Sequence, residues 1–340
     1  MGVAGSGEFE LIARLVESVE AARRERSASW GPQVHLGSGD DAAITVPSGA
    51  TATSVDAMVE GVHFRRDTAP LASIGRKALA TALSDLAAMG AAPGEAYVQL
   101  GVPDDLDEAG CAELAGGLAA VAAEHSVAVL GGDVTRAPSL TLAITVVGHA
   151  ASPEELVPRS GAHPGDVLAV TGELGGAAAG LLLLQRPELG DGLDAGVAER
   201  LRARQLEPEP RLEAGRALAS CGATAMIDVS DGLGGDARHL AQASGVEIAV
   251  ELERVPLQQG VAAVAEAAGV DPHELAVGRG EDYELLVTLP QERVDGALHA
   301  VRATGCGLTR IGAAREGTDV LLMEPDGSRR KPSGFDQLRG

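Results

Sequence analysis

Aromatic residues, lysine and cysteine are all scarce in this chain of 340 residues. Phe, Trp and Tyr make up 2% of the sequence and hydrophobic residues 45%, so the core must be built from Ala, Val, Leu and Ile. The only lysines are Lys77 and Lys331, and arginine carries the remaining positive charge. The three cysteines, Cys111, Cys221 and Cys306, lack the spacing of a zinc site. We interpret them as buried free thiols in a reducing cytoplasm.

Long hydrophobic runs and excess positive charge are also missing. No run of about 18 apolar residues is uninterrupted, so no membrane span is expected. Glu8 and Glu10 fall where a signal peptide would need apolar residues. The net charge of −22 makes nucleic acid and anionic membranes unfavourable partners. Most of the acidic residues are expected to be solvated at the surface.

Alternating helical and strand patterns predict two α/β (α+β) domains, each with a mixed sheet and helices packed on one face. The segment 151–166 has three prolines and no apolar period, so we place the boundary there. The predicted domains are residues 1–150 and 151–340. Helices are expected at 7–24, 71–90, 107–125, 174–185 and 291–303, with two more within about 196–220, one after the motif at 227–236 and others up to about 277. Strands are expected at 42–46, 51–59, 62–64, 95–102, 127–133, 140–150, 166–172, 246–252, 281–289, 308–313 and 319–323.

Acidic residues recur where apolar runs end, in most cases beside glycine. For any one of them, turn chemistry or helix capping is the simpler explanation. Asp85 fits that explanation less well, because its helical neighbours are apolar and an unpaired buried carboxylate is costly. The recurrence favours sites for a hard cation such as Mg²⁺, which prefers carboxylate oxygens and phosphates as ligands. The residues are Asp40, Asp41, Asp56, Asp85, Asp133, Asp228, Asp231, Asp236, Glu281 and Asp282.

Several carboxylates that hold Mg²⁺ most often serve phosphate chemistry, because the metal bridges phosphate oxygens and offsets developing charge. Backbone N–H groups at the neighbouring glycines can contact phosphate directly. The sequence has no GxxxxGK[ST] motif and no GxGxxG followed by a protein-kinase lysine motif. The EF-hand spacing also fails, because Leu233 stands where glycine is required. The pattern therefore indicates phosphate chemistry outside the P-loop and protein-kinase families.

Eight motifs, taken in order, resemble those of the thiamine-monophosphate kinase family, within the superfamily of aminoimidazole ribonucleotide synthetase. They are GEFELI, GSGDDAAI, Asp56 with GVHF, KALATALSDLAAMGAAP, GGDVTR, RSGAHPGD, IDVSDGL and GEDYEL. The resemblance covers residues 7–335 and implies an enzyme, a phosphotransferase whose acceptor is a phosphate group. It implies phosphorylation of thiamine monophosphate to thiamine diphosphate, the last step in making that cofactor. Direct in-line transfer from ATP, with several Mg²⁺ ions and no covalent nucleophile, is expected.

The resemblance also assigns roles to residues of this chain. ATP would be bound by Gly132, Asp133, Arg159 and Ser230, and thiamine monophosphate by His63, Glu281 and Phe335. The metal ligands would be Asp41, Ser54, Val55, Asp56, Asp85, Asp133, Asp228 and Asp231. Val55 stands where the family often has threonine, so only its backbone carbonyl could serve. A homodimer is expected, in which the N-terminal sheets of two subunits pair.

Other interpretations remain open from the sequence. Aminoimidazole ribonucleotide synthetase fits the fold, but GEFELI and SDLAAMGA fit it less well. Selenophosphate synthetase would need a reactive cysteine or selenocysteine and a lysine near the N-terminus, whereas the first ones here are Cys111 and Lys77. A hydrogenase-maturation relative would need a C-terminal cysteine, and the sequence ends FDQLRG. The alternative from a different class is a Mg²⁺-loaded nucleotide-binding or regulatory module without turnover.

Overall fold

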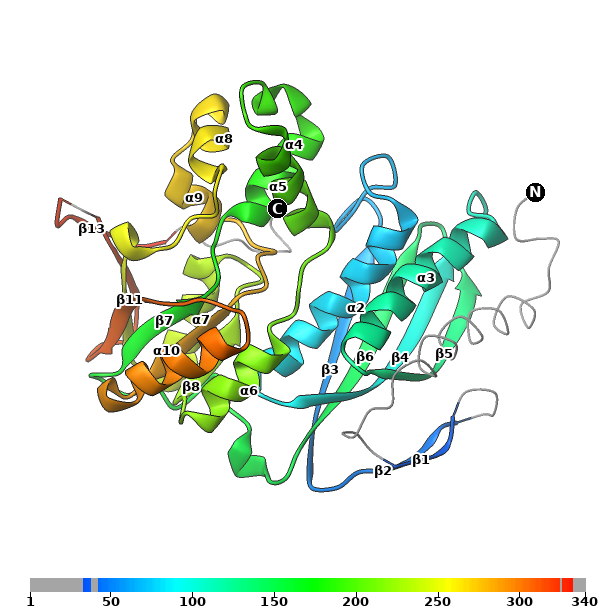
Figure 1. The fold of residues 1–340 in the computed structure, drawn as a ribbon, viewed down its shortest axis with the longest axis horizontal. Coiled ribbons are helices and arrows are strands. Elements are labelled where there is room, and N and C mark those ends of the chain that lie inside the picture. The colour runs from blue at the N-terminus through cyan, green and yellow to red at the C-terminus, as the bar shows by residue number, and fades with distance from the viewer. Residues whose placement is uncertain (1–32, 38–41, 325, 333–340) are drawn as a thin grey trace. The chain divides into compact units, whose positions relative to one another are not determined.

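The computed structural model describes residues 33–37, 42–324 and 326–332 (Figure 1). The helix expected at 7–24 lies outside these residues. The chain divides into two compact units. Among the described residues, one unit contains those up to Leu86 together with Ala91–Pro153, and the other contains Ala87–Gly90 and those from Glu154 onward.

The N-terminal unit is built on a four-stranded mixed sheet. The strands β3 (Ala50–Val59), β6 (Thr141–Ala150) and β4 (Ala92–Val102) are antiparallel neighbours, and β5 (Ala128–Arg136) pairs with β4 in parallel. The parallel pair is possible because the helix α3 (Glu108–Glu124) crosses over between β4 and β5. A separate two-stranded sheet is formed by β1 (Gln33–Leu36) and β2 (Ile44–Val46).

One face of this sheet is covered by α3 and α2 (Leu71–Ala88), which lie side by side in Figure 1. The two helices approach closely at Gly75 and Gly117, where an added Cβ would come within 1.9 Å of a carbonyl oxygen of the other helix. On β6 the helix-facing residues Ile144 and Val146 are at most 1% exposed, whereas Val55 on β3 is 67% exposed. The second face of the sheet is therefore open at the β3 edge.

The C-terminal unit has a seven-stranded mixed sheet that is covered on both faces. The helix α7 (Leu233–Ser244) packs on one face, and α6 (Leu212–Ser220) with α10 (Val294–Ala303) covers the other. The expectation of helices on only one face is wrong for this unit, because its central strands are buried on both sides. In order across the sheet the strands are β13 (Arg329–Arg330), β12 (Val320–Met323), β9 (Glu247–Glu251), β11 (Leu308–Arg315), β7 (Val167–Thr171), β10 (Leu285–Leu289) and β8 (Ala225–Asp228).

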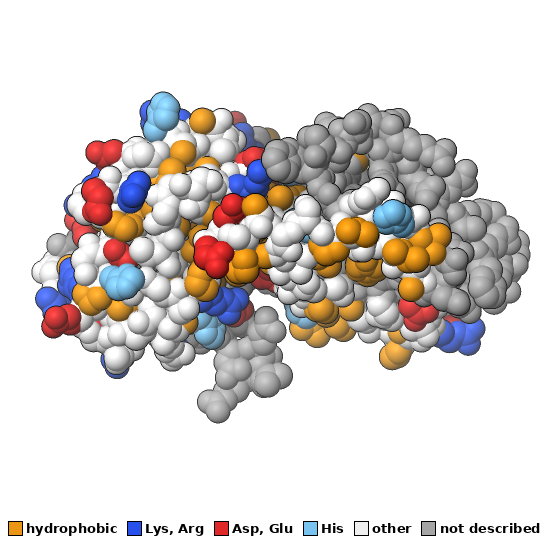
Figure 2. Space-filling view, turned by 90° about the horizontal axis from the view of Figure 1, so that it is seen from below, with side chains coloured by type: hydrophobic (Ala, Val, Ile, Leu, Met, Phe, Trp, Pro, Cys, Tyr) orange, Lys and Arg blue, Asp and Glu red, His pale blue; other side chains and the backbone are white. Residues whose placement is uncertain are grey.

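Four further helices of this unit share a second apolar core. They are α4 (Gly176–Gln185), α5 (Ala195–Leu206), α8 (Val261–Ala268) and α9 (Pro272–Val277). Short 3-10 helices occur at η2 (Pro153–Glu155), η3 (Pro187–Gly190), η4 (Leu252–Arg254) and η5 (Gln291–Arg293). No helix in the described part of the chain is long and apolar enough to cross a membrane. On the face shown in Figure 2, acidic and basic side chains of the described residues are scattered among neutral ones.

Three predicted strands differ from the structure. Val62 and His63 form a turn rather than a strand, and Phe64 makes only an isolated bridge with Glu60. The strand expected to stop in a glycine turn at Asp133 instead continues as β5 to Arg136, and a register shift between Val129 and Gly131 accommodates the glycines. The strand expected at 281–289 begins only at Leu285. The mixed α/β architecture with two sheets is confirmed.

Candidate active site

Two strand-end motifs of the C-terminal unit lie together. The strands β8 and β10 are antiparallel, and Asp228 is paired with Leu285. Beyond this pair the ladder becomes irregular but continues: the N–H of Val229 donates to the carbonyl of Glu284 at 2.7 Å. The N–H of Glu281 donates to the carbonyl of Ser230 at 2.9 Å. The structure thus joins Ser230, predicted to bind ATP, to Glu281, predicted to bind the second substrate.

Glycine is required for this close approach of the two motifs. A Cβ atom at Gly280 would lie 1.7 Å from the carbonyl oxygen of Ser230. Gly232 has a φ of +93°, and a Cβ there would lie 2.8 Å from the carbonyl oxygens of Val277 and Arg279. Any larger residue would push the two loops apart, because the atoms that it meets belong to the backbone.

Three carboxylates gather around the start of α7. Asp228 and Asp236 are 3% and 2% exposed. A side-chain oxygen of Asp236 accepts a hydrogen bond from the N–H of Asp231 at 3.0 Å. Burial, together with the negative charges of Asp228 and Asp231, raises the pKa of Asp236 well above its ordinary value. A cluster of this kind is stabilised by a proton or a bound cation.

Arg159 is brought next to these carboxylates by the chain segment before β7. The carbonyl of Pro158 accepts a hydrogen bond from the N–H of Met226 on β8 at 3.1 Å. The Arg159 guanidinium opposes the rise in the pKa of Asp236, so its positive charge acts on this cluster. The side chain is exposed and available to an anionic ligand.

Residues 281–284 alternate between strained and anchored positions. Glu281 and Tyr283 have left-handed backbones with φ values of 71° and 49°, which non-glycine residues seldom adopt. Asp282 is fully buried and accepts hydrogen bonds from the N–H groups of Gly175 at 2.7 Å and Ala177 at 3.0 Å, at the start of α4. Burial raises the pKa of Asp282 to about 6. Such strain persists only where the surroundings fix it, and it is common at functional sites.

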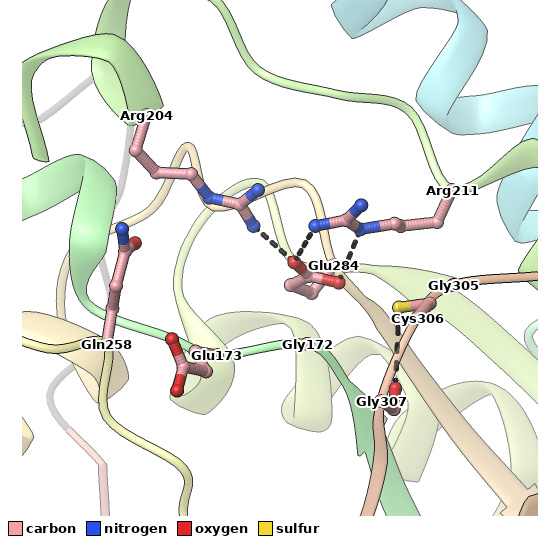
Figure 3. A pocket seen from close by; sticks show the side chains of 9 residues that line it. All are labelled: Gly172, Glu173, Arg204, Arg211, Gln258, Glu284, Gly305, Cys306 and Gly307. Atoms are coloured by element: carbon pink, nitrogen blue, oxygen red, sulfur yellow. Dashed lines mark hydrogen bonds and ion pairs between the residues drawn. The ribbon is translucent and has the colours of Figure 1, made fainter. Parts of the chain in front are cut away.

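The second anchor is Glu284, which lies between two arginines (Figure 3). It bonds to Arg204, and both of its oxygens accept from Arg211, at 2.7 and 2.9 Å. Thr171 donates to it at 2.6 Å. Although burial opposes the change, the two guanidiniums lower the pKa of Glu284. Glu284 and the two arginines border a cavity of about 230 Å³, which Cys306 also lines.

In the N-terminal unit, Ser54 and Asp85 are brought together between β3 and α2. The Ser54 hydroxyl donates to a side-chain oxygen of Asp85 at 2.5 Å. Asp56 lies two residues along β3 and therefore faces the same side as Ser54, whereas Val55 points to the opposite side. His63 follows in the turn after β3, where its Nδ1 accepts from the N–H of Val59 at 3.1 Å.

Gly132 and Asp133 lie at the far edge of this sheet. The register aligns Gly132 with Asp56 through β4 and β6, so the two residues are three strand spacings apart, about 14 Å. Asp133 is aligned with Ala57 in the next row, on the other face of the sheet. The N-terminal sheet by itself therefore does not bring Asp133 to Asp56.

No group of three or more His, Cys, Asp or Glu residues within the described ranges is placed to hold a metal ion. Asp41 and Phe335, predicted to bind metal and substrate, lie outside the described residues. The residues that sequence reasoning missed are Arg204, Gln205 and Arg211. They contact the 281–284 motif from 70 or more positions earlier in the chain.

Comparisons with known proteins identify the family of the chain. Residues 39–150 match the family AIR synthase related protein, N-terminal domain, and residues 163–322 match its C-terminal domain. The chain is 38% identical over 328 residues to thiamine-monophosphate kinase of Escherichia coli K12, covering 94% of each protein. Thiamine-monophosphate kinase from Stenotrophomonas maltophilia K279a superimposes with a TM-score of 0.81 at 32% identity, covering 96% of this chain and 98% of that one. AaThiL complexed with AMPPCP and TMP superimposes with a TM-score of 0.74 at 30% identity, covering 98% of each chain.

Proposed function

Since the chain belongs to the thiamine-monophosphate kinase family, we propose that it transfers the γ-phosphoryl group of ATP to thiamine monophosphate, forming thiamine diphosphate. The similar AaThiL was solved with AMPPCP and TMP, which supports both substrates. The observation that carries the proposal is the hydrogen bond between the Ser230 and Glu281 backbones. It joins a residue predicted to bind ATP to one predicted to bind thiamine monophosphate.

We propose that carboxylates of both units bind divalent cations. Burial and, after it, the charges of Asp228 and Asp231 raise the pKa of Asp236, and a cation held by Asp228 and Asp231 would offset the repulsion between these carboxylates. In the N-terminal unit, Ser54, Asp56 and Asp85 present oxygen donors on one side of β3. When bound, Mg²⁺ would neutralise phosphate oxygens during transfer. Asp41, the carbonyl of Val55 and Asp133 stay predicted ligands from the family's motifs, and Asp133 would bind apart from Asp56 because the sheet separates the two.

The protein residues mainly bind and orient the two substrates. Thiamine monophosphate carries an ionised phosphate, so direct in-line attack on ATP needs neither a covalent nucleophile nor a strong base. Arg159, Gly132 and Ser230 would contact the ATP phosphates. His63, Glu281 and Phe335 would bind thiamine monophosphate. These roles rest on the match to the family's motifs.

We also propose a homodimer that forms through the open face of the N-terminal sheet. Val55, which points to this face, is 67% exposed, an unusual position for a large apolar side chain on a strand. A Val55→Glu variant is expected to sediment as a monomer where the wild type sediments as a dimer. A monomeric wild type would contradict the assembly. The cytoplasmic location stays a prediction; all three cysteines are free thiols.

The proposed activity is tested by ADP release from the purified chain. We expect release that requires both thiamine monophosphate and Mg²⁺. Binding of ATP without such release would instead support the nucleotide-binding module without turnover. ADP release that thiamine monophosphate does not stimulate would direct attention to another acceptor.

A further inference from the structure

We infer that Gln205 is a positioning residue, which fixes the Glu281 carboxylate for recognition of thiamine monophosphate. The inference rests on the proposed function and extends it to a residue for which neither the motifs nor the resemblance gives a role. Gln205 lies in the last turn of α5. Its side-chain Nε2 donates to Oε2 of Glu281 at 2.5 Å.

Two adjacent residues of α5 contact the 281–284 motif. Arg204 donates to the carbonyl of Asp282 at 2.6 Å and also bonds to the Glu284 carboxylate. Gln205, the next residue, reaches the Glu281 side chain. The end of α5 therefore holds both the backbone and the side chain of the motif. This is the region where Glu281 and Tyr283 adopt left-handed backbones.

The hydrogen bonds that Gln205 makes and lacks indicate that it orients Glu281 rather than only stabilising the fold. Gln205 is 5% exposed, and its Oε1 is buried without a hydrogen-bond partner among the described residues. A buried acceptor without a partner costs free energy of folding. A side chain kept only for stability would be better as an apolar residue of the same shape. An amide at this position is explained if its NH₂ group must face the Glu281 carboxylate. The amide oxygen would repel that carboxylate, so it points away and stays without a partner in the described part of the chain.

The orientation of the Glu281 carboxylate follows from this bond. With Oε2 held by Gln205, the carboxylate cannot rotate freely, and Oε1 keeps one direction. Because Glu281 is proposed to hold the substrate rather than the transferring phosphoryl group, losing this restraint should weaken binding equally in the ground state and the transition state. Such a loss raises KM and leaves kcat unchanged.

The test uses Gln205→Met, which keeps the length of the side chain and removes both polar groups. Steady-state kinetics and calorimetric titration with thiamine monophosphate are measured on the full chain. We expect KM and Kd for thiamine monophosphate to rise about tenfold, as for the loss of one hydrogen bond to a charged group. The kcat and the KM for ATP should stay unchanged, and the melting temperature should not fall. Gln259→Met is the matched control, because Gln259 is exposed and its side-chain oxygen accepts from Arg200, another exposed residue.

A second arm asks whether Gln205 acts through Glu281. In a Glu281→Gln background, Gln205→Met is expected to change KM by less than about twofold, because the carboxylate that it orients is gone. An equal rise in both backgrounds, or no rise in the single variant, overturns the inference. So does a fall in melting temperature with KM unchanged.

The proposed function can fail separately. If the wild type binds thiamine monophosphate without forming product, the proposed activity is wrong, and the order of the Kd values still decides the role of Gln205. If the wild type does not bind thiamine monophosphate at all, both are overturned.

Discussion

The buried carboxylate of Glu284 offers a demanding test of how the 281–284 motif is held. Glu284→Gln keeps the shape of the side chain and removes its charge. Arg204 and Arg211 would then face each other across a neutral amide. One of the two oxygens that accept from Arg204, Arg211 and Thr171 would also become an NH₂ group that points at donors.

The expected cost follows from the burial of this group. Glu284 is fully buried, so water cannot replace the lost charge. Breaking a buried ion pair by removing one partner costs about 3–5 kcal/mol. For a unit of this size, about 2–4 °C is lost per kcal/mol, so the melting temperature of the C-terminal unit should fall by roughly 10 °C.

The measurement is calorimetric unfolding of wild type and variant at neutral pH, with Glu213→Gln as control. Glu213 pairs with Arg216 at the surface of α6 and is exposed. Removing its charge should change stability by less than about 1 kcal/mol. Equal melting temperatures for Glu284→Gln and Glu213→Gln would refute the claim that the two arginines depend on Glu284.

Other substitutions test separate parts of the account. Gly280→Ala would place a Cβ 1.7 Å from the Ser230 carbonyl and should destabilise the chain by about 1–3 kcal/mol in urea unfolding. Gly116→Ala, on α3 with nothing within 4 Å of the new atom, should instead stabilise it by about 1 kcal/mol, and equal effects would contradict the close approach. Asp228→Asn should lower the transfer rate by much more than tenfold, while the circular dichroism spectrum stays unchanged. A rate within tenfold of wild type, which corresponds to about 1.4 kcal/mol of barrier, would argue against a role of Asp228 as a metal ligand. Asp282 has a folded-state pKa of about 6 against an ordinary 3.8, so its contribution to stability is present below pH 3.8 and is lost as the pH rises through 6. Wild type should therefore lose about 2 kcal/mol relative to Asp282→Asn between pH 4 and pH 7, and a difference independent of pH would show that its pKa is not raised.

The mixed architecture and the family could be predicted from the sequence, because alternating apolar patterns and the ordered motifs depend on local residues. The strand at 281–284 was predicted wrongly for the opposite reason. Its residues have the composition of a strand, but buried bonds from Asp282 and Glu284 impose left-handed backbones at Glu281 and Tyr283. These contacts prevent a strand there, and they cannot be predicted from the local sequence because the partner residues are distant in the chain.

The supporting residues were missed because they are distant in sequence. Arg204, Gln205 and Arg211 stand in and after a helix whose pattern predicts only an amphipathic surface. Nothing in that segment indicates that their partners are Glu281 and Glu284. The strand expected to end in a glycine turn at Asp133 likewise continues, because β4 provides pairing partners as far as Arg136. The separation of Asp133 from Asp56 follows from strand order, which motif spacing does not encode.

The central claim is that this chain phosphorylates thiamine monophosphate. Its most direct test is ³¹P NMR of a reaction containing the purified chain, ATP, Mg²⁺ and thiamine monophosphate. We expect equal amounts of thiamine diphosphate and ADP, with neither formed by Asp228→Asn. Unchanged ATP, or ADP that appears with orthophosphate and no thiamine diphosphate, would contradict it.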